Sequence, residues 1–204
     1  MYKNSNSLLK LITGLRTGLN NIFLNTFKHS LKRIGITTGF NYQIEISVKY
    51  LYPLLFFCKN HSLCLFNLLM DLTCFEFLGS KYRFVLIYNL LNINNGLRLV
   101  IKCKITELNN TLLSSTSLFY TSNWAEREVF DFYGLYFYFN KDLRRILLDY
   151  GFQGYPLRKD FPLSGFLEVF YDDTIKKITY EKITLSQEYR LFFYTKNHTS
   201  SIYK

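Results

Sequence analysis

The sequence predicts an α+β fold: a small mixed sheet with helices on one face, plus an N-terminal amphipathic helix and an extended C-terminal segment. Three observations support this prediction. Residues 42–50 alternate strictly between apolar and polar side chains, which is typical of a half-buried strand. Residues 92–96 read Asn-Ile-Asn-Asn-Gly, which is turn chemistry and predicts a hairpin between the flanking apolar segments. A capped helical pattern begins near residue 122.

The elements of the N-terminal half follow in chain order. Apolar residues recur at helical spacing over residues 8–34. This basic stretch is expected to be an amphipathic helix that packs on the domain or on a partner, with a mitochondrial transit peptide as the alternative. A short helix is expected at 52–60, and residues 111–117 are expected to form a polar loop. Further strands are expected at 72–77, 82–90 and 97–106.

The helix after residue 121 carries its own start and stop signals. Ser122 or Asn123 is the expected N-cap, and Glu126 would complete a capping box. Arg127 lies four residues before an aspartate, so these two side chains are expected to pair on one face. Gly134 is expected to end the helix, because glycine adopts the left-handed conformation that closes a helix.

Beyond this helix the sequence is rich in turn residues up to residue 165, and residues 172–204 are expected to be an extended tail. We therefore divide the chain into three parts. Residues 1–40 form a basic amphipathic helical extension and residues 41–121 an α+β domain. Residues 122–204 hold the helix, a turn-rich segment and the tail.

Composition and charge limit the class of protein. With 49% hydrophobic residues the chain can bury a core, whereas its longest apolar runs, 51–58 and 63–70, are too short to span a bilayer. A single alanine beside 20 Phe and 17 Tyr indicates an organelle-encoded or otherwise A/T-rich gene. The net charge is +10, and residues 1–60 hold eight basic residues and one acidic residue. This excess could face RNA or anionic lipid, but a solvated or partner-bound extension is the favoured interpretation.

Patterns for catalysis and metal binding are absent from the sequence. Cys58, Cys64, Cys74 and Cys103 lack the CxxC spacing of zinc and iron–sulfur sites, so we expect buried thiols and no metal. The three histidines are scattered along the chain. No nucleophile elbow, phosphate loop or dinucleotide fingerprint is found. We therefore expect no catalytic residue and no bound cofactor.

Charged residues of both signs gather among aromatic residues between positions 122 and 170, and these are the candidate site residues. They are Glu126, Arg127, Glu128, Asp131, Asp142, Arg144, Arg145, Arg158, Lys159 and Asp160. The acidic members could act as an acid/base pair, but the arginine among them favours a structural ion-pair network. The basic members could bind phosphate or RNA. Each has an acidic neighbour, however, which favours pairing within the protein or against another protein.

The same region resembles a known family in several blocks of residues. The blocks are Asn123–Asp131, Gly134, Asp142–Leu147 and Gly154–Leu163. Their order and spacing resemble the thirty-kilodalton subunit of respiratory complex I, the NADH–ubiquinone oxidoreductase, of the mitochondrially encoded type. A weaker likeness covers roughly residues 42–190. The chain departs from the family at two places: Phe139-Asn140-Lys141 stands where Gly-His-Pro is usual, and Tyr155 stands where histidine is usual.

The resemblance implies a core structural and assembly subunit of the hydrophilic arm, peripheral to the matrix side of the mitochondrial inner membrane. It implies an extended C-terminal segment lying on the forty-nine-kilodalton subunit, with no cofactor and no catalytic residue of its own. The candidate charges would then dock on other complex I subunits, chiefly that one, and no nucleic acid partner is expected. The alternatives are a basic RNA-binding protein of ribosomal type and, behind it, an acid/base enzyme using Glu126 and Asp131.

Overall fold

In the computed structural model of the chain, residues 23, 31–37, 41–187 and 190 are described. The chain divides into two compact units, Met1–Phe161 and Pro162–Lys204. The division predicted from the sequence, at residues 40 and 121, remains a prediction. No helix within the described residues is long and apolar enough to cross a membrane.

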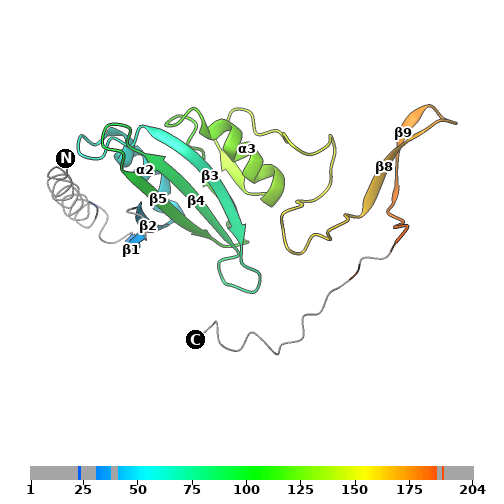
Figure 1. Cartoon of the computed structure of the whole chain (residues 1–204), viewed down its shortest axis with the longest axis horizontal. Helices are drawn as coiled ribbons and strands as arrows, with labels where there is room; N and C mark the ends of the chain where they lie inside the picture. Colours follow the sequence, from blue (N-terminus) through cyan, green and yellow to red (C-terminus); the bar gives the residue numbers. More distant parts are fainter. Residues whose placement is uncertain (1–22, 24–30, 38–40, 188–189, 191–204) are drawn as a thin grey trace, which may run out of the picture. The chain divides into compact units, whose positions relative to one another are not determined.

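The first unit is built on a five-stranded sheet (Figure 1). Its strands are β1 (Leu31–Thr37), β2 (Asn41–Ser47), β3 (Leu68–Glu76), β4 (Phe84–Leu91) and β5 (Arg98–Ile105), in the order β1-β2-β5-β4-β3. The β2–β5 pair is parallel and the other pairs are antiparallel. The sheet is therefore mixed, and the predicted α+β class is confirmed.

The helices begin where the sequence changes period. A short 3-10 helix, η1 (Val48–Tyr50), leads into α2 (Leu51–Asn60), and α3 (Ser122–Tyr133) packs against β3, as Figure 1 shows. In α2 the buried residues are Leu51, Leu54, Leu55 and Cys58. Their spacing of three and four residues places them on one helix face, which joins the core.

Alternation along the strands decides which side chains enter the core. In β5, Leu99, Ile101, Cys103 and Ile105 are buried while the residues between them are half-exposed, which follows from the two-residue period of a strand. All four cysteines of the chain are buried and none forms a disulfide. Burial raises the pKa of the Cys64 thiol to about 11, so this thiol stays protonated and unreactive at neutral pH.

The predicted N-terminal helix is wrong at its C-terminal end. Residues 31–37 form β1, which pairs antiparallel with β2, because the free edge of β2 offers a ladder that outweighs the helical period. Phe23, the one described residue of the earlier part, is helical and fully buried, and its ring meets Phe57 edge-on at 6.2 Å between centroids. The rest of the predicted helix lies outside the described residues.

Other boundaries differ from the prediction as well. The first predicted strand stops at Ser47, because residues 48–50 turn into η1, and β3 starts at Leu68, earlier than expected. The predicted polar loop is wrong in part: β6 (Thr111–Leu113) pairs in parallel with β7 (Tyr136–Tyr138). The signal for β6 was weak because it is a three-residue strand whose partner lies beyond a helix.

The start of α3 also differs from the prediction, whereas its end agrees. Thr121 occupies the N-cap position without a side-chain cap, and Ser122 lies inside the helix, fully buried, with its hydroxyl donating to the Phe119 carbonyl at 2.7 Å. Gly134 closes the helix at φ 71°, donating its N–H to Phe130. A Cβ at this glycine would lie 2.6 Å from the Tyr155 ring, so the position needs glycine for both conformation and space.

The second unit contains a hairpin where an extended tail was predicted. Strands β8 (Leu167–Asp172) and β9 (Lys177–Lys182) pair antiparallel over six residues each. The ladder continues by one bond from the Ile183 N–H to the Phe166 carbonyl at 3.2 Å. Asp172 supports the turn by accepting from the Thr174 N–H at 2.8 Å.

Candidate functional site

Asp131 lies near the C-terminal end of α3 and is fully buried. Its Oδ2 accepts hydrogen bonds from three successive backbone N–H groups, those of Ile146 (3.1 Å), Leu147 (2.9 Å) and Leu148 (3.0 Å). Its Oδ1 accepts from Arg145 Nη1 at 2.8 Å. Burial alone would raise the pKa of Asp131, but these donors together hold it below the ordinary value. One carboxylate therefore fixes a stretch of backbone that has no strand or helix of its own.

Arg145 extends this anchor to the next turn. Besides Asp131, its guanidinium donates from Nη2 to the Gly154 carbonyl at 2.9 Å. It also lies over the rings of Tyr155 (5.2 Å to the centroid) and Phe152 (5.8 Å). A planar guanidinium can stack and donate at the same time, which a lysine ammonium cannot do. The arginine thus ties residues 152–155 to the end of α3.

Arg158 occupies the space beside Gly134. Its Nε donates to the Tyr133 carbonyl at 2.7 Å, and its guanidinium lies over Tyr155 (4.5 Å) and Phe84 of β4 (5.3 Å). The Tyr155 ring is thus within cation–π distance of both arginines. Arg158 thus acts within the protein, where it caps a helix carbonyl and stacks on rings.

A second ionic cluster joins the end of the turn-rich segment to β3. Arg83 is paired with Glu76 at 2.5 Å, with Asp160 at 2.5 Å and with Glu107. The Lys159 backbone N–H donates to the other oxygen of Glu76, while its side chain is exposed. Glu76 is buried on an edge strand, and the Arg83 guanidinium and the Lys159 N–H each donate to it, which meets the requirement that a buried carboxylate be compensated.

Glu126 lies on α3 and is fully buried. It accepts from the Ser115 N–H (2.7 Å) and hydroxyl (2.8 Å), from the Ser114 hydroxyl (2.7 Å) and from Asn140 Nδ2 (3.0 Å). Burial raises the pKa of Glu126, and these hydrogen bonds oppose the shift. The predicted capping box is wrong, since the carboxylate binds the segment after β6 and the segment after β7.

The predicted pair of Arg127 with Asp131 is also wrong. Arg127 donates from Nε to the Arg144 carbonyl at 3.0 Å and lies over the Trp124 ring at 5.6 Å. The carboxylate is taken by Arg145, whose side chain is half-buried. Asp142 and Arg144 form an exposed bidentate pair at 2.6 and 2.8 Å, as the adjacent charges predict.

The structure separates the candidate residues into two groups. Glu126 and Asp131 offer no side-chain surface to a partner, which corrects their assignment as contact residues, and Arg145 and Arg158 work mainly inside the chain. Glu128, Arg144 and Lys159 are exposed. Large apolar side chains are exposed beside them: Trp124 on α3, and Leu147, Tyr150 and Leu157 on the turn-rich segment.

The arrangement does not support acid/base chemistry at the carboxylates. Glu126 and Asp131 each spend both oxygens on fixed donors, so neither is free to take a proton from a substrate. No group of three or more metal-ligating side chains is found within the described residues. The bonds of these two carboxylates are made to the protein's own backbone N–H, hydroxyl, amide and guanidinium groups.

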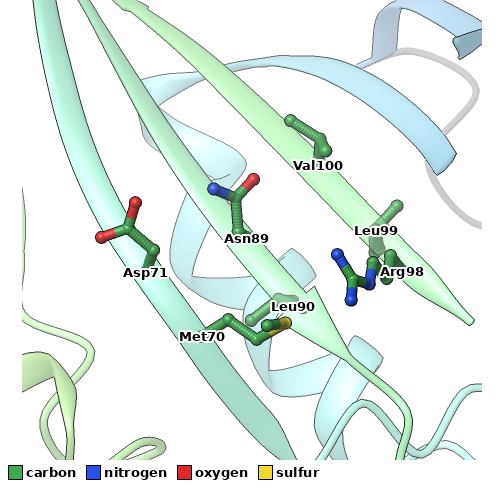
Figure 2. Close-up of a pocket in the computed structure, with 7 residues that line it drawn as sticks. All are labelled: Met70, Asp71, Asn89, Leu90, Arg98, Leu99 and Val100. Atoms are coloured by element: carbon green, nitrogen blue, oxygen red, sulfur yellow. The ribbon is translucent and has the colours of Figure 1, made fainter. Parts of the chain in front are cut away.

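A hollow of about 280 Å³ lies on the sheet, away from these charges (Figure 2). It crosses β3, β4 and β5 beside a register shift between Leu69 and Asp71, and Figure 2 shows Asp71, Asn89 and Val100 side by side on the three strands. Arg98 and Met70 also line it. Asp71 is the one carboxylate among the residues that line it.

Sequence reasoning missed several residues that build the site. Ser114 and Ser115 were assigned to a loop, and Glu76 and Arg83 were not considered. For Glu76 a signal existed: it follows Leu72 and Cys74 at the inward-facing positions of β3, and an acidic residue at such a position requires a paired cation. Nothing local in the sequence marks the serines, because their partner lies on α3.

Known proteins match the part of the chain that contains these residues. The family model described as "Respiratory-chain NADH dehydrogenase, 30 Kd subunit" matches residues 44–167, more than half of the chain. The "NADH-ubiquinone oxidoreductase subunit 9" of Prototheca wickerhamii is 44% identical over 144 residues, covering 71% of this chain and 74% of that protein. The protein of the same name from Acanthamoeba castellanii is 39% identical over 189 residues, covering 92% and 90%.

Solved structures show the same fold at lower identity. A trypsin-resistant fragment of Nqo5 aligns with a TM-score of 0.54 at 22% identity, covering 61% of this chain and 98% of the fragment. A chain of an archaeal membrane-bound sulfane sulfur reductase aligns with a TM-score of 0.62 at 20% identity, covering 72% and 85%. At these identities the likeness concerns the fold alone. The family match and the two relatives show that the chain belongs to the family of the 30 Kd subunit of respiratory-chain NADH dehydrogenase.

Proposed function

We propose that this chain is a core structural and assembly subunit in the hydrophilic arm of mitochondrial complex I, on the matrix side of the inner membrane. There it supports electron transfer from NADH to ubiquinone by docking on the forty-nine-kilodalton subunit. Family membership supports the assignment to complex I.

The observation that carries the proposal is that buried charges immobilise a segment with no regular structure. Between β7 and β8 the described chain forms neither helix nor strand, so no backbone ladder fixes it. Asp131, Arg145 and Glu76 take over that task by bonding to its backbone groups, and Arg158 ties it to the Tyr133 carbonyl of α3. Fixing one residue's backbone costs on the order of 1–2 kcal/mol, so several charge-assisted bonds are needed to hold such a segment.

These bonds fix the segment, so its exposed apolar side chains are held in defined positions. We define the anchored surface as the exposed residues of α3 and of the fixed segment: Trp124, Glu128, Arg144, Leu147, Tyr150, Leu157 and Lys159. Tyr150 is 95% exposed and Leu147 is 58% exposed, which is unfavourable in water for a chain that acts alone. Binding a partner with a pre-ordered surface avoids the entropy cost of ordering it during association.

The anchored surface has the composition of a protein interface. Apolar and aromatic side chains, including the one tryptophan, are mixed with charges of both signs. The internal charges of the candidate set act as positioning residues, and the exposed ones contact the partner at the rim. This division gives the gathered charges a role in ordering the segment and in docking.

The experiment is to place one negative charge on the anchored surface and the same charge elsewhere. Leu147→Asp changes only a side chain, since the Leu147 N–H remains bonded to Asp131. Leu108→Asp is the matched control, because Leu108 is 95% exposed on the loop after β5. Each tagged variant competes with the normal chain in mitochondria, and the fraction in assembled complex is read from native gels. Arg158→Glu would not be a clean test, because the Arg158 side chain bonds and stacks within the fold and its loss would disturb folding as well as docking.

We expect Leu147→Asp to lower incorporation at least tenfold, the order expected for a central apolar contact, and Leu108→Asp to change it by less than about twofold. Protease resistance of the free chain should be equal for both variants, which separates docking from folding. Equal incorporation of the two variants would contradict the proposal. Cross-linking from position 150 tests the partner: the forty-nine-kilodalton subunit should be captured, and capture of another subunit in its place would refute that part.

A further inference from the structure

A β-bulge in β3 forms the acidic wall of the hollow on the sheet. In the ladder with β4, Leu69 and Asp71 face successive residues, so Met70 between them is an extra residue without a partner. Met70 and Asp71 are therefore both exposed, whereas a regular strand would turn the second of them into the core. The bulge thus places the Asp71 carboxylate on the outer face of the sheet, beside Asn89 of β4 (Figure 2).

Arg98 forms the opposite wall of the hollow. It alternates with buried Leu99 on β5, so its side chain lies on the same outer face as Asn89 and Asp71. Figure 2 shows the Asn89 amide on β4 between Asp71 on β3 and Arg98 on β5. The backbones of β3 and β5 are two inter-strand spacings apart, roughly 10 Å. No ion pair joins Asp71 to Arg98 within the described residues, so a space remains between the two charges.

The three polar side chains of the hollow have bonding capacity left. Asp71 accepts one hydrogen bond at Oδ1, from the N–H of its neighbour Leu72 at 2.8 Å. Neither Asn89 nor Arg98 makes a side-chain hydrogen bond or ion pair to another described residue. A carboxylate only accepts, a guanidinium only donates and an amide does both. The hollow therefore presents an anion, an amide and a cation on three neighbouring strands.

The two opposite charges favour a ligand that itself carries both signs. A phosphate that is attracted by Arg98 meets the Asp71 carboxylate on the other wall, and a metal cation meets the guanidinium, so each is disfavoured at one end. A zwitterion satisfies both walls, with its ammonium group on Asp71 and its carboxylate on Arg98. An amino acid with one hydrogen bond at each end spans roughly 8–9 Å, which agrees with the separation of the two strands.

The size and the rest of the lining agree with an amino acid that has an apolar side chain. Liquid water takes about 30 Å³ per molecule, so a hollow of about 280 Å³ holds roughly nine non-hydrogen atoms, the size of leucine. Met70, which is 48% exposed, and Val100 add apolar surface beside the charges. Leu90 and Leu99 turn their side chains into the core. The floor between the walls is therefore mainly strand backbone.

We propose that this hollow binds a free amino acid with an apolar side chain, such as leucine. Its ammonium group lies on Asp71, its carboxylate on Arg98, and the Asn89 amide lies between them. The hollow is open to solvent and the contacts are few, so the expected Kd is about 1 mM. Binding here uses none of the anchored surface and does not require assembly into the complex.

The test compares three ligands of nearly equal size on the full chain. They are L-leucine, 2-hydroxy-4-methylpentanoate, in which a hydroxyl replaces the ammonium group, and L-leucinamide, in which an amide replaces the carboxylate. Binding is measured by saturation-transfer NMR titration. We expect L-leucine to saturate near 1 mM and each analogue to bind at least tenfold more weakly, because it loses one charge-assisted contact. An analogue that binds as tightly as L-leucine, or no saturation by L-leucine up to about 20 mM, overturns the proposal.

Two variants assign the walls separately. Asp71→Asn should weaken L-leucine at least tenfold and remove its advantage over the hydroxy acid, because Asp71 is the group that distinguishes ammonium from hydroxyl. Arg98→Gln should remove the advantage over L-leucinamide for the corresponding reason. Lys102→Gln is the matched control, since Lys102 lies further along β5 on the same face and outside the hollow, and it should change the Kd by less than about twofold. Loss of binding without these crossed changes in preference overturns the proposal, and urea midpoints of the variants verify that the fold is intact.

Side chains of another protein are the rival occupant of the hollow. In that case none of the three ligands binds, while Asp71→Asn and Arg98→Gln lower incorporation into the assembled complex on native gels, and the proposal is overturned. Failure of L-leucine to bind, with the expected loss for Leu147→Asp, leaves docking by the anchored surface standing. Binding of L-leucine with normal incorporation of Leu147→Asp removes that docking function and keeps the amino-acid site.

Discussion

Asp131→Asn is the change that most directly tests whether buried charge holds the turn-rich segment. The aspartate accepts one bond from Arg145 and three from the N–H groups of residues 146–148. An asparagine has one carbonyl oxygen and one NH2 group. If the oxygen faces the three N–H groups, the NH2 group faces a guanidinium that can only donate. The reverse orientation leaves the three backbone donors facing an NH2 group.

The structure sets the size of the effect. Removing one partner of a buried ion pair costs about 3–5 kcal/mol. The Arg145 side chain keeps 23% of its surface exposed, so water can compensate it in part and the lower end, about 3 kcal/mol, applies. That is more than a hundredfold in the unfolding equilibrium. With a urea slope of roughly 2 kcal/mol per molar, the midpoint should fall by about 1.5 M.

The assay is urea unfolding of the full chain, followed by the fluorescence of Trp124, its one tryptophan. Trypsin cleavage after Arg144 and Arg145 should speed up in parallel, because both lie in the segment released. Asp142→Asn is the control: it removes an equal charge from an exposed pair with Arg144, and its midpoint should stay with the normal chain. If Asp131→Asn shares that midpoint, the buried bonds do not stabilise the segment and the reasoning fails.

The same carboxylate has a defined pH dependence. Its folded pKa lies below the ordinary 3.8, so its stabilising contribution is complete above that pH and is lost as pH falls through the lowered value. The difference between the normal chain and Asp131→Asn should therefore shrink in strong acid. A difference that stays constant down to the lowest pH at which the chain folds would contradict the assigned direction of the shift.

Two further predictions concern the same region. Gly134→Ala and Gly96→Ala both place a Cβ at positive φ (71° and 65°), which costs about 1 kcal/mol, but only the first also brings the Cβ to 2.6 Å from Tyr155. Gly134→Ala should lose at least about 2 kcal/mol more than Gly96→Ala in urea unfolding, and equal losses would count against close packing there. Glu126→Gln should flatten the decline in stability as pH rises from 4.5 towards neutrality, since a raised folded pKa makes the ionised carboxylate cost stability; an unchanged pH profile would refute this.

The sheet could be predicted because its signals are local. β5 was expected at 97–106 and is found at 98–105. Its inward-facing residues alternate with outward-facing ones, and this two-residue period is visible in the sequence. The turn at 92–96 was identified by its asparagines and by Gly96, which adopts φ 65°. Strand β1 was missed because its pairing depends on the free edge of β2, which lies later in the sequence.

The hydrogen-bond and ion-pair partners in the site could not be predicted, because local spacing rules gave the wrong partners. The spacing of Arg127 and Asp131 allows an exposed pair worth about 0.2–0.5 kcal/mol. The tertiary structure instead gives Asp131 four donors, and hydrogen bonds to a charged group contribute about 1.5–3 kcal/mol each. The capping role expected of Glu126 failed for the same reason, since buried serine donors outweigh an exposed backbone N–H.

These hydrogen bonds and ring contacts explain the departures from the family pattern. Asn140 stands where histidine is usual, and its Nδ2 donates to Glu126, a task that needs a donor but no titrating group. Tyr155 also replaces a usual histidine, and its ring stacks on two arginines, a task that needs an aromatic face but no charge. Phe139, in place of a usual glycine, keeps the positive φ of 67° that glycine adopts without strain. Asn140 supplies the hydrogen-bond donor and Tyr155 the aromatic ring, both without an imidazole. Imidazole titration is therefore not part of how this segment is held.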